Sequence, residues 1–389
     1  MANSRPKVVV VSNRLGSFGG GERWVCEMAA RLKEKLELSI INPISDKDVV
    51  RMDEERLSRL FNIKDIKVTR LKCLGIRHRF HGNIDLTVLL PTLHGLAALN
   101  DAVANSDVVY ELSFNPFILF WSMFFAGLHG KRFILGLHNP DFLVGESGKK
   151  SGIFGRIMQR ILLKCVKEMH VQTKSQMSLL LKAGYSGKKY YIPHYLYFRI
   201  SEKDANSYGK DFDVLLTGRL SVYQKGIDLL EKIVEETLSK DKKVHFTIIG
   251  SGEGGGILKL LEKKHKANVS YLGFVSDYEL KKRYMKSSLF ILTSRYETPG
   301  LSLLEAQSYG MPAIAFDVMG PRDIMTKNVQ GELIKPFDTD KFADRIISFK
   351  GKFTDREGYR RIRIEIWSTI NKRYDESAFV NKFEEMIKG

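Results

Sequence analysis

Two glutamates stand eight positions apart in RYETPGLSLLEAQSYGMP, residues 295–312, on either side of a Pro-Gly turn. The preceding run SLFILTS, residues 288–294, is typical of a buried strand. Glu297 is therefore expected just beyond the carboxyl end of that strand, where open α/β sheets bind ligands. Glu305 is expected about one turn inside the next helix, where a carboxylate can accept hydrogen bonds from vicinal hydroxyls such as those of a ribose. The alternative is a surface loop entering a helix, because helix starts favour acids anyway.

An anion site is predicted at the same turn, because the first amides of a helix lack partners inside it and can bind phosphate. These amides belong to Gly300, Leu301 and Ser302. The segment TGRLSVYQKGIDLL, residues 217–230, adds Arg219 and Lys225 in the loop after another predicted strand. Two cations there can hold a diphosphate and offset the charge on a departing phosphate. Two solvated surface cations are the alternative.

The first glycine-rich stretch, SNRLGSFGGGERW at residues 12–24, lies between the first predicted strand and the first predicted helix. Its glycines let the backbone approach a ligand closely, and the helix start can bind phosphate. They are Gly19, Gly20 and Gly21. The stretch is not a P-loop, since no Gly-Lys-Ser/Thr follows, and Trp24 replaces the last glycine of the dinucleotide pattern. A flexible strand-to-helix turn is the alternative.

The second glycine-rich stretch, IIGSGEGGGILKLL at residues 248–261, matches G-x-G-x-x-G through Gly250, Gly252 and Gly255. This pattern is typical of NAD(P)-dependent oxidoreductases. A ribose-binding acid should then end the next strand, about 20 residues later. That strand is predicted to end in YLGFVSD, where the first acid is Asp277. The dinucleotide interpretation is therefore a rival and not the first choice.

One histidine occupies a position of interest. The segment ILGLHNPDF, residues 134–142, ends a predicted strand in His138. Because carboxyl ends of parallel strands line the ligand cleft of such sheets, His138 is a candidate catalytic residue. A lone histidine at a strand end is more often structural, and that alternative stays open.

Short apolar runs alternate with helical stretches along the whole chain, which predicts an α/β protein with parallel sheets and helical crossovers. Strands are expected at 7–13, 37–42, 107–112, 132–138, 168–173, 213–218, 244–250, 268–273, 288–294 and 312–316. We expect a first domain at residues 1–195, a polar linker at 196–212 and a second domain at 213–369. A helix at about 370–389 is expected to pack back on the first domain.

Charge and cysteine content restrict the setting. Residues 1–200 hold 30 Lys and Arg against 17 Asp and Glu, whereas residues 201–389 hold 32 against 28. The first half is thus the part expected to meet a polyanion, although a general solubility charge is the alternative. The three cysteines show no metal-ligand spacing, and their odd number argues against a disulfide framework. The N-terminal sequence leads directly into a strand and not a signal peptide, so a cytoplasmic protein is expected.

With these motifs in hand, the chain resembles the GT-B-fold retaining glycosyltransferases, specifically glycosyltransferase family four. GGGERW is similar to that family's N-terminal glycine loop, GRLSVYQKG to its Arg and Lys-Gly phosphate clamp, and ETPGLSLLEA to its paired-glutamate motif. IIGSGEG, YLGFVSDYEL and DVMGPRDIM resemble three further segments of the family. All six occur in the family's order from Gly19 to Asp323.

The resemblance implies two Rossmann-like domains and a reaction that moves a sugar from a nucleoside diphosphate to a hydroxyl or phosphate acceptor, such as a lipid-linked sugar or a polysaccharide. It implies no bound cofactor, because the nucleotide sugar is a co-substrate, with UDP or GDP favoured. No metal is expected, because the sequence has no carboxylate cluster with metal-ligand spacing. The family roles carry over by position in this sequence. They place Glu297 and His138 at the sugar, Arg219 and Lys225 at the diphosphate, Gly300, Leu301 and Ser302 at a phosphate, Glu305 at the ribose, Phe274 and Val275 at the base, and Gly20 with its neighbours at the phosphates.

Some residues depart from the family pattern. Thr298 stands where glycine is common, IPHYLY at 192–197 replaces the usual junction between the domains, and Asp323 replaces a glutamate. Three other functions are alternatives: an oxidoreductase, a GT-B-fold sugar-nucleotide epimerase, and a non-catalytic basic protein that binds nucleic acid. The last is disfavoured, because no helix-turn-helix or aromatic-interleaved basic pattern occurs. No nucleic-acid partner is expected.

A membrane contact is also predicted. Residues 114–130, FNPFILFWSMFFAGLHG, hold no Lys, Arg, Asp or Glu, and a helix is expected from Pro116 to Leu128. It is too short to span a bilayer, which needs about 20 residues. The nearby KCLGIRHRFHG supplies Lys72, Arg77 and Arg79. We therefore expect the first domain to dock peripherally on the inner face of an anionic membrane, with burial of the run in the core as the alternative.

Overall fold

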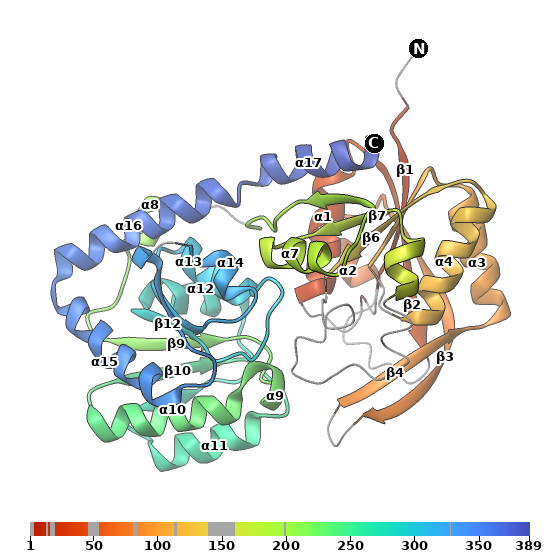
Figure 1. Ribbon diagram of the computed structural model, residues 1–389. Helices are drawn as coiled ribbons and strands as arrows, with labels where there is room; N and C mark the ends of the chain where they lie inside the picture. The colour runs from red at the N-terminus through yellow and green to blue at the C-terminus, as the bar shows by residue number, and fades with distance from the viewer. Residues whose placement is uncertain are drawn as a thin grey trace. The chain divides into compact units, whose positions relative to one another are not determined.

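The protein divides into two compact units in the computed structural model (Figure 1), which describes residues 4–12, 15, 20–45, 54–80, 84–112, 115–138, 160–197, 200–326 and 328–389. Unit 1 comprises Met1–Pro193 together with Ser377–Gly389, and unit 2 comprises His194–Glu376. The chain therefore leaves unit 1, builds unit 2 and returns to unit 1 with its last residues.

Unit 1 contains an eight-stranded sheet in the order β4-β3-β2-β1-β5-β6-β7-β8. Its strands are β1 (Lys7–Val11), β2 (Glu37–Ser45), β3 (Lys67–Phe80), β4 (Ile84–Pro91), β5 (Val108–Glu111), β6 (Arg132–Leu137), β7 (Glu168–Val171) and β8 (Lys188–Tyr191). All neighbours pair in parallel except β3 and β4, which form an antiparallel pair. The sequence predicted parallel sheets, which holds for every strand pair of this sheet except β3–β4, and it did not predict the strands β3, β4 and β8.

Helices cover both faces of this sheet. One face carries α3 (Leu93–Ala104), α4 (Pro116–Leu128), a helical segment at 160–165 and α7 (Lys174–Lys182), whose apolar side chains share cores with the strands. The other face carries α1 (Gly20–Leu32) and the C-terminal helix α17 (Glu376–Lys388), which meet where Trp24 contacts Phe379 and Phe383. A short helix, α2 (Glu54–Leu60), precedes β3.

The C-terminal helix is fixed to unit 1 by polar contacts at its carboxyl end. Arg132 donates hydrogen bonds to the carbonyl oxygens of Met386 and Ile387, and it also pairs with Glu168. Lys35 on the turn after α1 contacts the carboxylate of Glu384. Because the last carbonyls of a helix have no partner inside it, Arg132 satisfies groups that would otherwise need water.

Unit 2 contains a six-stranded parallel sheet in the order β11-β10-β9-β12-β13-β14. Its strands are β9 (Asp213–Thr217), β10 (His245–Ile249), β11 (Val269–Tyr271), β12 (Leu289–Leu292), β13 (Ala313–Phe316) and β14 (Gly331–Ile334). The helices α10 (Ile227–Lys240), α11 (Gly255–Lys264) and α15 (Thr339–Thr354) contribute to one core, and α12 (Asp277–Lys286), α13 (Leu301–Ser308) and α16 (Arg356–Arg373) contribute to the other. Smaller helical turns are α8 (Glu202–Ala205), α9 (Val222–Lys225), α14 (Pro321–Ile324) and a 3-10 turn at Asn328–Gln330.

The segment 196–212, expected to be a linker, falls within unit 2, and its described residues, 196–197 and 200–212, contribute to the packing of that unit. Leu196 and Phe212 are buried in its two cores. Arg363 on α16 is fully buried and donates to the carbonyl oxygens of Ala205 and Tyr309 at 2.7 Å each. The polar composition of this segment therefore reflects helix capping and contacts with α16, and not an extended connection.

A buried histidine lies beneath α17 in unit 1. His170 on β7 is fully buried, its Nδ1 lies 2.6 Å from Tyr110 Oη, and its Nε2 lies 3.0 Å from the Ile192 carbonyl oxygen. Nε2 therefore donates to the carbonyl, and Nδ1 accepts from the tyrosine. Burial lowers the pKa of His170 from 6.5 to about 4, so the ring is neutral in the folded protein.

Unit 1 is expected to lose stability as the pH falls from about 6.5 toward 4, because only the unfolded chain then protonates His170. Between pH 7 and pH 5 this amounts to about 2 kcal/mol. Calorimetric unfolding of wild type and His170→Gln at both pH values should show a smaller loss in the variant. His94→Gln, at an exposed position on α3, is the matched control and should lose as much as wild type. Equal losses for wild type and His170→Gln would contradict this assignment.

Candidate functional site

The candidate site of unit 2 lies where the strand order reverses. The chain passes from β9 outward to β10 and β11, and then returns to place β12 on the other side of β9. Both strands run parallel, with Leu289 opposite Val214. The helices that follow these strands, α10 and α13, belong to the two different cores of unit 2, and ligands of open α/β sheets bind at the point where the connections part in this way.

The loop after β9 is held against the loop after β12. Thr293 Oγ1 donates to the Lys225 carbonyl oxygen at 2.8 Å, directly after β12. Gly226 adopts φ 63°, and a Cβ atom there would stand 2.2 Å from the Thr293 carbonyl oxygen. Only glycine tolerates both this backbone conformation and this approach. Lys225 is thereby fixed with its side chain beside the second loop.

An ion pair joins the two loops. Lys225 Nζ contacts Glu297 Oε1, and Ser294 Oγ donates to the same oxygen at 2.6 Å. The Glu297 side chain is 7% exposed and that of Lys225 is 16% exposed. A carboxylate removed from water needs a nearby counter-charge and hydrogen bonds, and Lys225 and Ser294 supply them. The structure thus brings together two of the predicted site residues that lie 72 positions apart.

The start of α13 lies beside the Lys225–Glu297 pair. Gly300 adopts φ 99° and provides no side-chain cap. Ser302 Oγ is buried and finds no hydrogen-bond partner within the part of the chain that the structure describes. A Cβ atom on Gly218 would stand 3.9 Å from Lys225 Nζ and 4.0 Å from Ser302 Oγ. A cation, a free hydroxyl and the partnerless amides of a helix start therefore converge, which suits an anionic group.

Glu305 is positioned by a residue that sequence analysis missed. Tyr284 on α12 donates its hydroxyl hydrogen to Glu305 Oε2 at 3.1 Å, and Thr217 Oγ1 at the end of β9 lies 2.7 Å from the same hydroxyl. Burial and the Glu305 carboxylate raise the pKa of Tyr284 well above its ordinary value, so the hydroxyl keeps its proton. Nothing in KKRYMK distinguishes Tyr284 from a core tyrosine, because the contact depends on tertiary packing.

The loop that carries Arg219 is supported by the second glycine-rich stretch. Arg219 itself is exposed. A Cβ atom on Gly250 would stand 1.8 Å from the Gly218 carbonyl oxygen, and one on Gly252 would stand 2.5 Å from the Leu220 carbonyl oxygen. Close backbone packing thus requires both glycines. The G-x-G-x-x-G pattern has this structural explanation, which needs no dinucleotide.

Phe274 and Val275 follow β11 at the edge of the sheet. Phe274 is 78% exposed, whereas Val275 packs partly against the core that includes α13. An exposed aromatic ring beside a fixed backbone segment can stack on a flat ligand.

The predicted residues of unit 1 form a separate group. His138 follows β6, its ring lies 4.3 Å from that of Trp24, and its Nε2 lies 3.2 Å from Gln172 Nε2. Gly20 and Gly21 begin α1, whereas Gly19 lies outside the described residues. Sequence analysis did not single out Glu111, which is fully buried at the carboxyl end of β5 beside β1. The signal was present, since an acid inside the apolar run DVVYEL is unusual.

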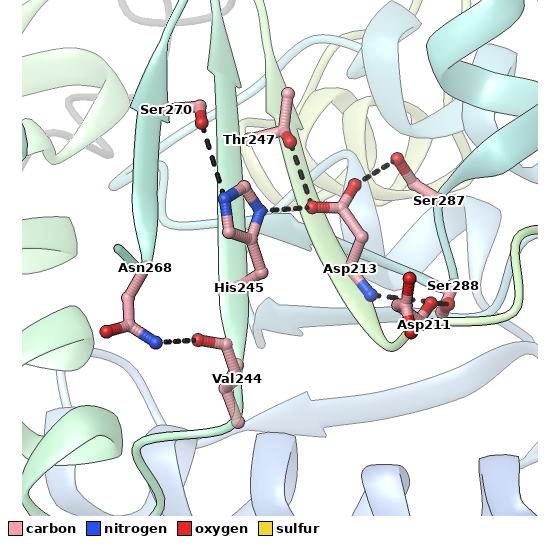
Figure 2. Close-up of polar contacts among 9 residues, drawn as sticks. All are labelled: Asp211, Asp213, Val244, His245, Thr247, Asn268, Ser270, Ser287 and Ser288. Atoms are coloured by element: carbon pink, nitrogen blue, oxygen red, sulfur yellow. Dashed lines mark hydrogen bonds and ion pairs between the residues drawn. The ribbon is translucent and has the colours of Figure 1, made fainter. Parts of the chain in front are cut away.

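A second polar cluster lies at the amino-terminal ends of the strands of unit 2, away from the loops described above (Figure 2). His245 Nδ1 donates to Asp213 Oδ1 at 3.0 Å, and Ser270 Oγ lies 3.3 Å from His245 Nε2. Thr247 and Ser287 also donate to Asp213. Ser, His and Asp are the residue types of a hydrolytic triad, but here they tie the first residues of neighbouring strands together. We assign this cluster a structural role.

A family model matches part of unit 2, and several curated proteins match part of the chain. A family model for glycosyl transferases group 1 matches residues 198–361. An uncharacterised 41.2 kDa protein in the cps region of Klebsiella pneumoniae is 31% identical over 193 residues, which is 49% of this chain and 50% of that protein. Poly(ribitol-phosphate) alpha-N-acetylglucosaminyltransferase of Staphylococcus aureus (strain COL) is 35% identical over 137 residues, which is 34% of this chain and 27% of that enzyme. The chain thus spans half or less of these curated relatives.

Solved structures resemble the whole chain. TarM of S. aureus superposes with a TM-score of 0.74 at 16% identity, covering 100% of this chain and 99% of TarM. Anabaena Alr3699/HepE, in complex with UDP and glucose, superposes with a TM-score of 0.73 at 15% identity, covering 99% and 100%. Such identities speak for the fold, and both neighbours are GT-B glycosyltransferases. The chain therefore has the GT-B fold expected from its sequence, and its residues 198–361 match the family model for glycosyl transferases group 1.

Proposed function

We propose that this protein transfers a sugar from a nucleoside diphosphate sugar to a hydroxyl or phosphate acceptor, with retention of the anomeric configuration. The observation that carries the proposal is the Lys225–Glu297 pair beside the start of α13, which has no side-chain cap, at the point where the strand order reverses between β9 and β12. The family match spans all of these residues. The names of the S. aureus relative and of the UDP complex of HepE support a nucleotide-sugar donor.

The roles in unit 2 follow from chemistry and position. Lys225, Arg219 and the amides at the start of α13 would hold the diphosphate, since cations and helix starts both favour anions. Glu305 would accept hydrogen bonds from the ribose hydroxyls, and Tyr284 would fix its carboxylate for that purpose. Phe274 and Val275 lie at the sheet edge, where they would receive the base.

In the proposed reaction the bond between the anomeric carbon and the diphosphate oxygen breaks as the acceptor oxygen bonds to the same carbon. The acceptor's proton passes to the departing phosphate on the same face of the sugar. Lys225, Arg219 and the helix start stabilise the charge that grows on that phosphate. Glu297 lies beside Lys225 and would face the reacting sugar.

Unit 1 is proposed to bind the acceptor, a lipid-linked sugar or a polysaccharide, and unit 2 the donor. His138 would act beside the transferred sugar, and Gly20 with its neighbours would contact the donor phosphates. The oxidoreductase alternative loses its main support, because packing explains Gly250 and Gly252.

The most direct test is a thermal-shift screen of the full chain with UDP, GDP, ADP, their sugars and NAD. We expect one diphosphate and its sugar to raise the melting temperature by several degrees, because ligands that bind only the folded state stabilise it. A rise with NAD and none with any nucleoside diphosphate would contradict the proposal.

Lys225→Met should destabilise unit 2 by about 3 kcal/mol, because it leaves the Glu297 carboxylate buried without its counter-charge. The double variant Lys225→Met/Glu297→Gln should recover most of this stability while transfer stays lowered about 100-fold or more. Chemical unfolding and sugar-transfer rates at saturating donor measure the two effects. Arg219→Ala, at an exposed position, should lower transfer without loss of stability. Near-normal transfer by the double variant would rule out the phosphate clamp.

Glu305→Ala should weaken nucleoside diphosphate affinity about tenfold or more, because hydrogen bonds to a charged group contribute about 1.5–3 kcal/mol each. Tyr284→Phe should weaken it less, since the carboxylate remains but loses one donor. Titration calorimetry measures both, and Glu365→Ala, at an exposed glutamate on α16, serves as the matched control. Unchanged affinity in Glu305→Ala would show that this carboxylate does not contact the ribose.

A further inference from the structure

Helix α4 exposes an apolar stripe on unit 1. Phe117, Phe120, Phe124 and Leu128 are 44%, 57%, 49% and 64% exposed, and they follow one another at helical spacing along one side. The opposite side of α4, which includes Ile118 and Phe125, is buried in the core with α3 and the strands. The run 116–128 thus has two sides. One is buried in the core, as the alternative to a membrane contact expected, and the other is exposed.

This outward side is unusual for a surface helix. Such helices place charged or polar residues away from the core, but α4 contains no Lys, Arg, Asp or Glu. The rings of Phe120 and Phe124 stack with centroids 6.4 Å apart, and Trp121 meets Phe124 edge to face at 5.6 Å. Grouped exposed aromatic residues of this kind indicate an interaction surface.

Exposed cations lie on a helical segment next to α4. The helical segment 160–165 adjoins α4, because Leu119 and Leu162 share one core cluster. Its Arg160 and Lys164 are exposed at i and i+4, beside the 45% exposed Ile161. On the other neighbour, α3, Asp101 is exposed and accepts from Asn105. Residues 151–200 contain nine Lys and Arg and a single acid, Glu168, which is paired with Arg132.

We infer that this face of unit 1, the apolar stripe with Arg160 and Lys164, docks on the surface of an anionic lipid bilayer. Aromatic side chains and cations side by side match the two layers of such a surface, with the rings at the acyl boundary and the cations at the headgroups. A second copy of the chain fits less well, because a net charge of +17 opposes self-association. The inference does not depend on the proposed sugar transfer.

The cations of this surface differ from Lys72, Arg77 and Arg79, which the sequence predicted beside the apolar run. Lys72 precedes Cys73 on β3, and Cys73 is buried in the core beneath α3 and α4. Because successive side chains of a strand point to opposite faces, Lys72 points away from α4. The side chains of Arg77 and Arg79 lie outside those that the structure describes. None of the described helices is both long and apolar enough to cross a bilayer, so the contact would be peripheral.

The test is sedimentation of the full chain with vesicles of neutral phosphatidylcholine, alone or with about a third of phosphatidylglycerol. We expect binding to the anionic vesicles that weakens as salt screens the charges. Arg160→Ser/Lys164→Ser should lower the partition coefficient about 25-fold, since each cation contributes about fivefold. Phe120→Ser/Phe124→Ser should lower it at both low and high salt. Lys259→Ser/Lys263→Ser, two exposed lysines at the same spacing on α11 in unit 2, is the matched control and should bind as wild type does.

Thermal unfolding of each variant separates docking from folding, and light scattering reports the oligomeric state. The inference would be supported if Arg160→Ser/Lys164→Ser and Phe120→Ser/Phe124→Ser both weaken vesicle binding while their melting temperatures stay unchanged. Absence of binding to anionic vesicles at low salt would overturn it. So would a dimer of wild-type protein that Phe120→Ser/Phe124→Ser dissociates, with equal vesicle binding by both, because the stripe would then be an interface between copies.

Discussion

Glu297 carries a negative charge where water has little access, and its ion pair with Lys225 is the contact on which the candidate site depends. A buried carboxylate without a counter-charge is costly, so the loop after β12 can keep this residue only where Lys225 reaches it. Lys225 in turn is fixed by the left-handed turn at Gly226 and by the hydrogen bond from Thr293. One electrostatic requirement therefore sets the distance between the two loops.

The surrounding structure supports this pair from two directions. Gly250 and Gly252 bring the loop after β10 against the backbone of residues 218–220, so the neighbouring strand fixes the path of the Arg219 loop. On the other side, Tyr284 links the end of β9 to Glu305 inside α13. Rigid elements thus hold the charged groups in place, which limits the reorganisation that binding would require.

The sequence predicted those parts of the fold that a single physical signal determines. The predicted strands are short, mainly apolar runs, and each has its counterpart in one of the two sheets. The hairpin β3–β4 was missed because its residues alternate between buried and exposed, as in Leu71, Lys72 and Cys73. The segment 196–212 was expected to be a linker because it is polar. Polar residues also cap short helices, as Ser201 caps α8, and the end of α8 packs against the buried Arg363, which donates to the Ala205 carbonyl oxygen. Glu297 and Lys225 were each predicted in loops after strands, but their ion pair was not predicted, and neither was the role of Tyr284, because long-range side-chain contacts leave no local pattern.

The return of the chain to unit 1 has a consequence for synthesis on the ribosome. Unit 2 is continuous from His194 to Glu376, whereas unit 1 needs both its first 193 residues and the segment from Ser377. Domains generally fold as units while the chain emerges. Unit 1 therefore cannot complete its fold until all of unit 2 and then α17 have been translated. Until then, Trp24 and Tyr110 lack the contacts that Phe379 and Phe383 of α17 provide. Unit 1 is therefore the first unit to be synthesised and the last to complete its fold.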